Sequence, residues 1–503
     1  MALQYPTLDS LLLRPSTDLD IEASFHRGSN LGPYYSVMLS DDPGWKAAQE
    51  LFDDFAQLYN SYSSQQQVFE LLDHYETLCD DQLKILRRAI NLDVGVQSRY
   101  SRTIETSRAV TAEKWTWRLM RMLYKDRIDR PSPSSALLHT PAITPKAKNA
   151  ELCTRDQLFR ELNIILRWCQ VNAADVISTR KDVAIFAEKS VLWENTLHQL
   201  QTNTSTKRNL VSSIDADCTF REKANLDDLD KVSEGHFLQL VFAFLRAGQT
   251  NKAIDLCDHC GQAWRAAILK GSLLYDDDGY SAPAVSENAP LRQPTLKGNR
   301  NYFLFRQLCH QLASEPQLSQ IERAIFASLS GHLTSLLPVC LSWQDHLWAY
   351  SLCRLDYGLQ VAVQQASAQG LCAADFSPAA ETARSRSPTG PSTLDQIGSG
   401  LKYLDRRLDF GLEDILAEIE ASSSEVLKSE SLDPYCVTQR FIILNDVDSA
   451  LCWLFDYLDG HDPTSNGEIG DAMTSAGSSS PKHLLRFVAH FVLVARNLNL
   501  ISN

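Results

Sequence analysis

The sequence lacks the patterns on which several classes of protein depend. Alternation of apolar and polar residues between tight turns, the mark of β-strands, is nearly absent. The 48 Lys and Arg residues are outnumbered by 62 Asp and Glu residues, which gives a net charge of -14, and they form no basic stripe. Both features argue against direct nucleic-acid binding. Phosphate-binding glycine loops, H-E-x-x-H and G-x-S-x-G elements are also missing, so no enzyme class is indicated.

Segments for secretion or membrane insertion are lacking as well. The N-terminal stretch has a short apolar run followed by acidic residues, unlike a secretory signal. The most apolar long stretch, His483–Leu500, contains Arg486, His490 and Arg496, whereas a bilayer-spanning helix needs about 20 mainly apolar residues. The 12 cysteines are scattered through helical patterns, which favours reduced, buried thiols in the cytosol or nucleus. We therefore expect no transmembrane segment.

Helical spacing is the dominant pattern that is present. It is clearest from His236 to Tyr275, where three short amphipathic patterns follow one another. Gly248 and Gly261 stand where helix C-termini are expected, Thr250 is the expected N-cap of the second helix, and the third is expected to reach Tyr275. Stacked helix–turn–helix units build a solenoid, a fold used for scaffolding more often than for catalysis. The sequence thus predicts an all-α, irregular helical solenoid.

Breaks in the helical pattern suggest how the chain is organised. Residues 1–30 are expected to be flexible, and residues 31–503 to form the solenoid. Four stretches rich in Ser, Pro and Gly or of low complexity predict loops, near 129–150, 276–300, 375–400 and 460–482.

Further helix boundaries are predicted by caps, prolines and glycines. The run from Gln65 to Tyr100 reads as one long helical stretch. Pro316 stands near the predicted start of a helix that Gly331 ends, and Ser342 is the predicted cap of a Trp-rich helix.

Two stretches resemble metal sites without completing one. Cys257 and Cys260 form a single CxxC, whereas a structural zinc site normally takes two such pairs, so two thiols packed at a helix end is the preferred interpretation. The segment Asp276–Gly279 resembles part of a calcium loop. In that register the first and twelfth positions are Leu274 and Val285, which cannot bind calcium, so an exposed acidic loop is expected instead.

No catalytic, metal-binding or cofactor-binding residue is predicted, and no cofactor. His483 and His490 lie at heptad spacing on one helix, where packing or partial exposure is preferred over metal binding. Five tryptophans recur on helical faces, and their large rings favour core anchors over contacts with a partner. They are Trp115, Trp117, Trp264, Trp343 and Trp348.

Four Ser-Pro or Thr-Pro pairs fall in the predicted loops. They are Ser132-Pro133, Thr140-Pro141, Thr144-Pro145 and Ser387-Pro388. Loops are accessible, so these pairs are candidates for proline-directed phosphorylation, whose added charge would weaken an interface.

Several long segments resemble the nucleoporin 107 family, called nucleoporin 84 in yeasts. The closest resemblance is in Arg246–Asp277, and further segments agree in the family's order. These are Glu113–Ile128, Gly298–Ala313, Ile321–Tyr350, and the pair Gln439–Leu451 and Lys482–Arg496. The resemblance extends from about Glu113 to the C-terminus and includes Trp and Cys positions, which are rare residue types.

The resemblance implies an all-helical, folded-back solenoid of the type shared with vesicle-coat scaffold proteins. It implies a structural subunit of the Y-shaped outer-ring complex of the nuclear pore, at the nuclear envelope, needed for pore assembly and hence for transport of mRNA and protein. It implies no catalytic residue. The family's helical N-terminal part pairs with the nucleoporin 96 family (145C in yeast), and its C-terminal tail docks onto nucleoporin 133.

One departure from the family concerns the C-terminal end. Family members continue for several hundred residues beyond the point that resembles Asn503, so the C-terminal tail module is expected to be absent. A solenoid that ends without a polar cap exposes the face meant for its next repeat. Binding to the nucleoporin 96 family and to other outer-ring nucleoporins is expected, whereas binding to nucleoporin 133 is in doubt. A vesicle-coat-like helical scaffold or adaptor is the alternative function.

Overall fold

The described part of the chain is almost entirely helical. The structure, a computed structural model, describes residues 43–62, 67–92, 101–129, 144–180, 182–202, 210–277, 296–368, 408–460 and 481–501. Within these ranges extended pairing is limited to isolated bridges and to one antiparallel pair, β1 (Asp276–Asp277) with β2 (Leu296–Lys297). The all-α prediction is therefore confirmed. None of the helices in these ranges combines the length and the apolar character needed to cross a membrane.

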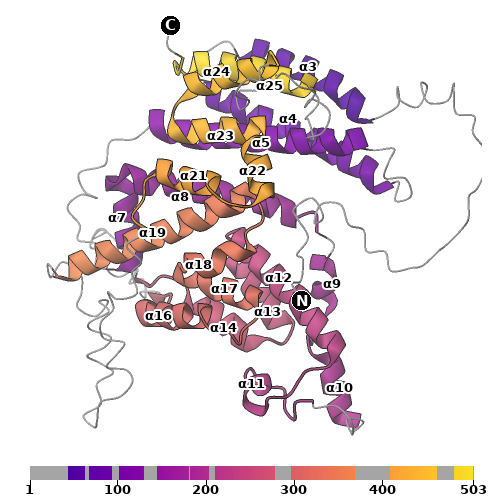
Figure 1. Cartoon of the computed structure of the whole chain (residues 1–503), viewed down its shortest axis with the longest axis vertical. Coiled ribbons are helices and arrows are strands. Elements are labelled where there is room, and N and C mark those ends of the chain that lie inside the picture. The colour runs from indigo at the N-terminus through magenta and orange to yellow at the C-terminus, as the bar shows by residue number, and fades with distance from the viewer. Residues whose placement is uncertain are drawn as a thin grey trace, which may run out of the picture. The chain divides into compact units, whose positions relative to one another are not determined.

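The chain divides into two compact units. Unit 1 comprises residues 1–131 and 416–503, and unit 2 comprises residues 132–415. The helices of unit 1 are α3 (Pro43–Ser61), α4 (Val68–Leu92), α5 (Ser101–Ile128), α22 (Glu425–Ser431), α23 (Pro434–Leu444), α24 (Val447–Leu458) and α25 (Pro481–Asn497) (Figure 1). The boundary between the units falls within α21 (Leu412–Glu420).

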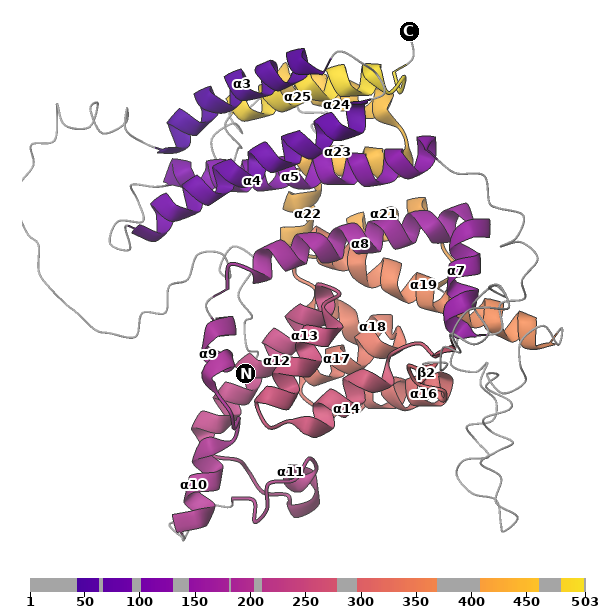
Figure 2. The same ribbon diagram turned by 180° about the vertical axis from the view of Figure 1, so that it is seen from behind.

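Unit 1 is built from both ends of the described chain. Helix α4 packs on α5, and the late helices α23 and α25 pack on α5, with α25 also against α3 (Figure 2). Aromatic rings fill the space between them: Phe55 stacks on Tyr75 with ring centroids 4.4 Å apart, and Trp117 lies 5.1 Å from Phe487. The chain therefore turns back on its own first helices, as a folded-back solenoid requires.

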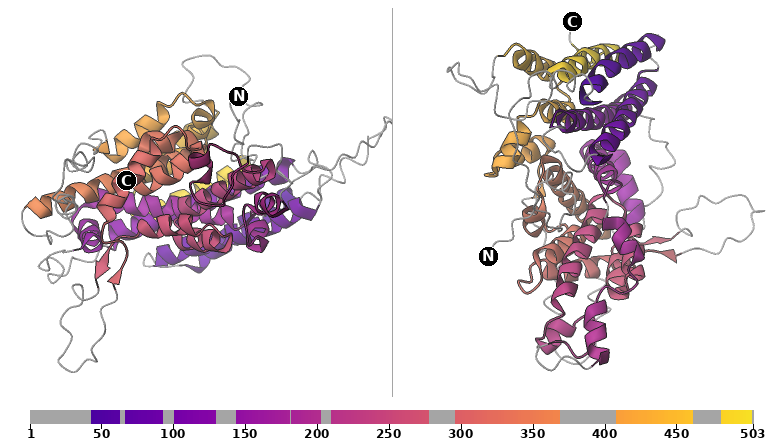
Figure 3. Two further views of the ribbon diagram at one scale, coloured as in Figure 1. Left: turned by 90° about the horizontal axis from the view of Figure 1, so that it is seen from below. Right: turned by 90° about the vertical axis from the view of Figure 1, so that its right-hand side faces the viewer.

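Unit 2 contains the remaining helices. They are α7 (Pro145–Arg155), α8 (Gln157–Ile177), α9 (Asp182–Glu188), α10 (Glu194–Thr202), α11 (Cys218–Glu222), α12 (Asp228–Arg246), α13 (Thr250–His259), α14 (Ala263–Gly271), α16 (Tyr302–Ala313), α17 (Gln320–Ser330), α18 (Leu333–Leu336), the 3-10 helix η3 (Leu337–Val339) and α19 (Trp343–Ala368). The β1–β2 pair stands out from these helices (Figure 3).

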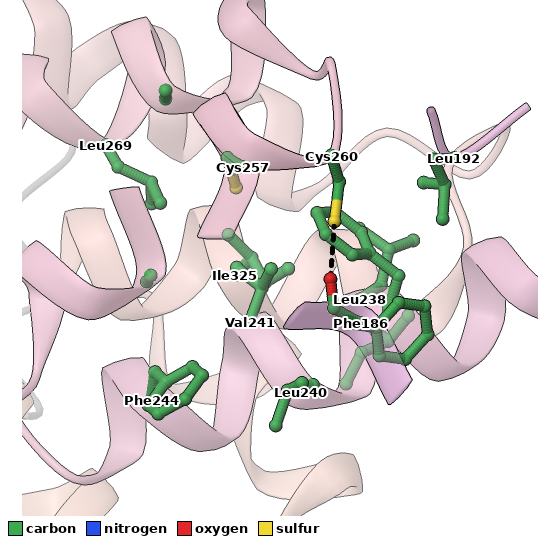
Figure 4. Close-up of a cluster of buried hydrophobic side chains, with 14 of the residues drawn as sticks. Phe186, Leu192, Leu238, Leu240, Val241, Phe244, Cys257, Cys260, Leu269 and Ile325 are labelled. Atoms are coloured by element: carbon green, nitrogen blue, oxygen red, sulfur yellow. Dashed lines mark hydrogen bonds between the residues drawn. The ribbon is translucent and has the colours of Figure 1, made fainter. Parts of the chain in front are cut away.

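The core of unit 2 forms around α12. This helix packs against α8, α13 and α17, while α8 also packs on α19. Side chains from α9, α12, α13, α14 and α17 meet in one apolar cluster, with Val241 and Ile325 facing each other near its centre (Figure 4). Burial of such apolar stripes, rather than helix propensity, supplies most of the stability of short helices.

Glycine turns and one serine cap lie where the sequence predicts them. Gly248, Gly261 and Gly331 follow α12, α13 and α17 with φ angles of 67°, 76° and 67°, a region that side chains with a Cβ rarely adopt. A Cβ on Gly331 would approach the Asp356 carboxylate to 2.5 Å, so glycine is required there for space as well. The Ser342 hydroxyl accepts a hydrogen bond from the Asp345 backbone N–H at 3.1 Å and so caps α19.

Other predicted boundaries are wrong. Thr250 is the first residue of α13, and its N-cap is Gln249, which makes no capping bond through its side chain. Helix α14 ends at Gly271 rather than Tyr275, because Leu274 turns extended and bridges to Asn299.

Two further helices can be compared with their predicted ranges. The long run expected over Gln65–Tyr100 contains α4, which spans Val68–Leu92, while residues 63–66 and 93–100 lie outside the described residues. Helix α17 begins after Pro316, at a capping box in which Ser319 and Glu322 bond each other's backbone N–H groups.

The predicted loops fall largely outside the described residues. That holds for residues 1–30, for 375–400, for most of 460–482 and for 278–295 within the range 276–300. The loop expected near 129–150 ends earlier than predicted, because α7 begins at Pro145.

Candidate functional site

The first candidate, the Cys257–Cys260 pair, lies in the buried core of unit 2. In the described ranges, His, Cys, Asp and Glu side chains form no group of three or more that could hold a metal ion. Both thiols face the apolar cluster, and Sγ of Cys260 donates to the Phe186 carbonyl at 3.5 Å (Figure 4). Burial raises the pKa of the Cys257 thiol to about 12 and also raises that of Cys260. These shifts favour the protonated thiols, whereas the thiolate is the metal ligand and the nucleophile.

The acidic segment beginning at Asp276 is not an exposed loop where the structure describes it. Asp276 and Asp277 form β1, and Asp276 pairs with Lys146 of α7, with 2.6 Å between Oδ2 and Nζ. The Asp276 side chain is largely buried. The expectation of an exposed loop is therefore wrong for Asp276, while Asp278 and Gly279 lie outside the described residues.

Thr144 is not an accessible phosphorylation site. Its side chain is buried, and its Oγ1 accepts a hydrogen bond from the Ala147 N–H at 3.2 Å, which caps α7. Thr followed by Pro is also a signature of a helix start, because Pro fits the first helical position. The prediction of accessibility is wrong for this pair, since a kinase would have to unwind α7. Ser132, Thr140 and Ser387 lie outside the described residues.

Three of the five tryptophans are confirmed as core anchors. Trp117, Trp343 and Trp348 are almost completely buried. Trp264 is half-buried and packs on Trp193, with ring centroids 5.4 Å apart. Trp115, on α5, is half-buried as well.

A buried ion pair that the sequence analysis missed joins the two ends of unit 1. Arg486 of α25 donates to Oε2 of Glu113 on α5, across 373 positions of sequence, and both side chains are fully buried. The other Glu113 oxygen accepts from Nε1 of Trp117 at 3.2 Å. Arg486 also donates to Nδ1 of His483 at 3.0 Å, and its guanidinium lies 4.9 Å from the centre of the Phe55 ring. The sequence held one signal for this pair: Arg486 lies within an apolar helical stripe, and a buried cation requires a buried partner.

The two candidate histidines take part in this cluster rather than in a metal site. Nδ1 of His490 lies 2.9 Å from the Tyr75 hydroxyl, and both histidines are buried. Burial, and after it the nearby Arg486 charge, lower the pKa of His483 to about 3 and that of His490 to about 4. Both imidazoles are therefore neutral in the folded protein at physiological pH.

These pKa values predict that unit 1 loses stability in mild acid. An unfolded histidine binds a proton near pH 6.5, whereas the folded ones do not until far lower pH, so protons favour the unfolded chain as pH falls below about 6.5. Going from pH 7.5 to 5 should cost up to about 2 kcal/mol for each histidine. Burial raises the pKa of Glu113, which opposes the loss at the acid end of the range. Protection factors of α25 amides, obtained by dividing the intrinsic exchange rate at each pH by the observed rate, measure the change.

The control for this experiment is His490→Gln, which keeps a polar group but does not titrate. We expect the acid-induced loss of α25 protection, expressed as a free energy, to fall by about half in this variant. An unchanged pH dependence would show that His490 is not responsible.

A second polar cluster holds unit 2 together around Arg246, the last residue of α12. Its guanidinium donates to the Asp345 carboxylate at 2.8 Å, to the Cys169 carbonyl at 2.8 Å and to the Gln344 carbonyl at 3.1 Å. It also lies 5.0 Å from the centre of the Trp348 ring. Burial alone would raise the pKa of Asp345, but Arg246 more than offsets it and the pKa is lowered. One side chain thus ties α8, α12 and α19 together.

The start of α12 is anchored in the same way. The Asp230 carboxylate accepts from the backbone N–H and the hydroxyl of Thr196 at 2.6 and 2.7 Å, and from the Asn195 amide at 2.9 Å. These bonds fix α10 against the first turn of α12. The opposite side of that turn remains available to solvent.

Three large apolar side chains are exposed on α12 and on α9, which packs on it, and we call them the α12 surface. Leu229 and Val232 of α12 are 66% and 59% exposed, and Ile185 of α9 is 60% exposed. The end of α9 is held to α12 by a 3.3 Å contact between Nζ of Lys189 and the Ser233 hydroxyl. Exposed apolar groups held on rigid helices are typical of protein interaction sites. Sequence reasoning missed them because an exposed leucine and a buried one look alike in a helical pattern.

Comparison with known proteins gives matches along most of the chain. The profile of the family described as "Nuclear pore protein 84 / 107" matches residues 107–503. "Nuclear pore complex protein Nup107" of Homo sapiens is 32% identical over 474 residues, covering 92% of this chain and 46% of that protein. "Nuclear pore complex protein Nup107" of Drosophila melanogaster is 23% identical, covering 92% and 50%. "Nucleoporin nup107" of Schizosaccharomyces pombe is 25% identical, covering 76% and 42%. The chain spans about half the length of the relatives it matches.

Proposed function

The chain belongs to the nuclear pore protein 84 / 107 family, and we propose that it is a structural subunit of the outer-ring scaffold of the nuclear pore complex. The observation that carries the proposal is the family match over residues 107–503, which covers the helices of unit 2 and, in unit 1, all described helices except α3, α4 and the first residues of α5. The chain would act at the nuclear envelope. It would contribute to pore assembly and hence to transport of mRNA and protein.

We propose that the chain works by rigid presentation of helix faces, without catalysis or a cofactor. Two ion pairs support this reading, because Glu113 with Arg486 and Arg246 with Asp345 each hold helices together. Ion pairs of this kind fix the relative position of helices more than they add net stability. A scaffold needs that property, since its neighbours bind surfaces made from several helices.

We further propose that the α12 surface contacts a partner of the nucleoporin 96 family. Its three exposed side chains supply the apolar centre that tight interfaces share. Obligate contacts bury over about 2,000 Å², so the polar faces around these residues would also take part. Other outer-ring nucleoporins are expected partners through their shared assembly.

The partner proposal is tested with the double variant Leu229→Glu/Val232→Glu in the full chain. We expect binding to a purified nucleoporin 96 partner to weaken at least about tenfold, because two carboxylates would be desolvated in the interface. The control is Ile85→Glu, which changes an apolar side chain that is 50% exposed on α4 of unit 1. Titration calorimetry measures both. Equal affinity of the two variants for the partner would show that the α12 surface is not the interface.

The scaffold proposal itself is tested by copurification and imaging of the tagged chain. Recovery with outer-ring nucleoporins and a signal at the nuclear rim are expected. Recovery with vesicle-coat subunits, without outer-ring nucleoporins, would overturn the proposal in favour of a vesicle-coat-like scaffold.

A further inference from the structure

One glycine of α12 is not explained by the packing of the described chain. Gly235 lies in the interior of this helix, where glycine makes folding about fivefold less favourable than alanine does. Among the residues that the structure describes, a Cβ added at Gly235 would meet no atom within 4 Å other than the neighbouring backbone of its own helix. An alanine would therefore fit there and stabilise α12, so the folded chain alone does not account for the glycine.

The other helical glycines whose surroundings the structure describes are required by neighbouring side chains. A Cβ on Gly271 of α14 would lie 2.7 Å from the Phe305 ring, and one on Gly358 of α19 would lie 3.2 Å from the Phe159 ring. Open space lies beside Gly235 instead. A glycine in a helix interior with open space beside it marks a place where a second molecule can approach the backbone closely.

Gly235 lies on the side of α12 that faces solvent, beside the α12 surface. On the other side of the helix, Leu238, Val241 and Phe244 point into the apolar cluster (Figure 4). Because an α-helix has about 3.6 residues per turn, Gly235 lies on the same side as Val232, three residues before it. Four side chains at intervals of three, four and three residues form a seam along this side: Leu229, Val232, His236 and Gln239.

We propose that an α-helix of the partner bound at the α12 surface crosses α12 at Gly235. This inference rests on the proposed contact with the nucleoporin 96 partner, and it adds which kind of element docks and where. A seam spaced three and four residues apart accepts the side chains of a second helix, as paired helices do. The missing Cβ lets the two helix axes come closer than the usual distance of about 8–10 Å.

The seam also indicates what the partner helix carries. Leu229 and Val232 are exposed and apolar, so the partner helix has apolar side chains at that end of the contact. The exposed His236 and the half-buried Gln239 follow one and two turns later, and they favour hydrogen-bonding side chains at the other end. This division from apolar to polar fixes the direction in which the partner helix lies on α12.

The test compares Gly235→Ala and Gly235→Leu with the unchanged full chain. Both variants should raise the hydrogen-exchange protection of α12 amides by up to about fivefold, because Ala and Leu are better helix formers than Gly. Affinity for the purified nucleoporin 96 partner, measured by titration calorimetry, should fall about tenfold for Gly235→Ala and about a hundredfold for Gly235→Leu, because the added side chain overfills a closely packed crossing. A purely structural role for Gly235 would not give a more stable helix together with weaker binding.

Gln311→Leu is the control, because Gln311 is an exposed residue in the middle of α16, and this variant should bind the partner as the unchanged chain does. If Leu229→Glu/Val232→Glu lowers the affinity but Gly235→Ala and Gly235→Leu do not, the helix crossing is wrong while the α12 interface stands. If Leu229→Glu/Val232→Glu binds as tightly as the unchanged chain, the proposed interface itself fails. Should Gly235→Leu lose α12 protection, Gly235→Ala alone decides.

Photo-crosslinking identifies the docked element directly. A photoreactive benzoylphenylalanine in place of the exposed His236 should cross-link to partner residues three or four positions apart, because such residues share one helix face. Cross-links to partner residues one or two positions apart would show a loop or a strand and overturn the proposal. Cross-links to a second copy of this chain, or to another segment of it, would also overturn it.

Discussion

Replacing Arg486 with methionine should lower the free energy of unfolding of unit 1 by about 3–5 kcal/mol. The change leaves Glu113 fully buried, with the Trp117 indole N–H as a remaining hydrogen-bond donor. A buried carboxylate without its cation is costly, whether it stays charged or takes up a proton. Thermal unfolding followed by circular dichroism, with hydrogen exchange of α5 and α25 peptides, measures the loss.

The double variant Glu113→Leu/Arg486→Met separates the pair from its surroundings. Removing both charges together should restore most of the stability, because apolar replacements of a buried ion pair are often neutral or better. If the double variant is as unstable as Arg486→Met alone, the loss comes from packing around residue 486 and not from the stranded carboxylate.

Trp348→Ala should lower the free energy of unfolding of unit 2 by about 3–5 kcal/mol. The indole is buried, meets Phe242 edge-on at 6.0 Å and lies beneath the Arg246 guanidinium. Its removal opens a cavity and loosens the side chain that ties α8, α12 and α19 together. Hydrogen exchange of α12 and α19 amides should rise, while that of α25 should not.

Leu432→Ala provides the comparison, since Leu432 is half exposed after α22. It should change stability by no more than about 0.5 kcal/mol. A loss for Trp348→Ala as small as that for Leu432→Ala would contradict its role as a core anchor.

The parts of the fold that the sequence predicted are those set by local chemistry. Gly248, Gly261 and Gly331 could be predicted as helix ends because a positive φ angle is a local property of glycine and does not depend on distant residues. Thr250 shows the limit of this reasoning, because a polar residue near a helix start does not say which position is the cap. The Thr144-Pro145 pair fits both a phosphorylation site and the start of a helix. The buried Thr144 side chain shows that it is the helix cap.

The pairing of distant helices was beyond the reach of sequence patterns. Periodicity shows which face of α25 is apolar, but not that this face meets α5 and α3. Arg486 is an example. A cation in an apolar stripe indicates that a buried acidic partner exists, but the sequence does not show that this partner is Glu113. The α12 surface was missed for the same reason, since helical spacing alone does not separate a side chain covered by its own chain from one left uncovered.

The discontinuous make-up of unit 1 has a consequence for the order of events during translation. Helices α3, α4 and α5 leave the ribosome early, but α23 and α25, which cover them, follow only after the whole of unit 2. At bacterial to eukaryotic elongation rates that delay is about 15 to 60 s. Unit 2 can complete its core in that interval. The aromatic faces of α3, α4 and α5 remain exposed meanwhile, and they can bind chaperones or associate wrongly with a neighbouring nascent chain.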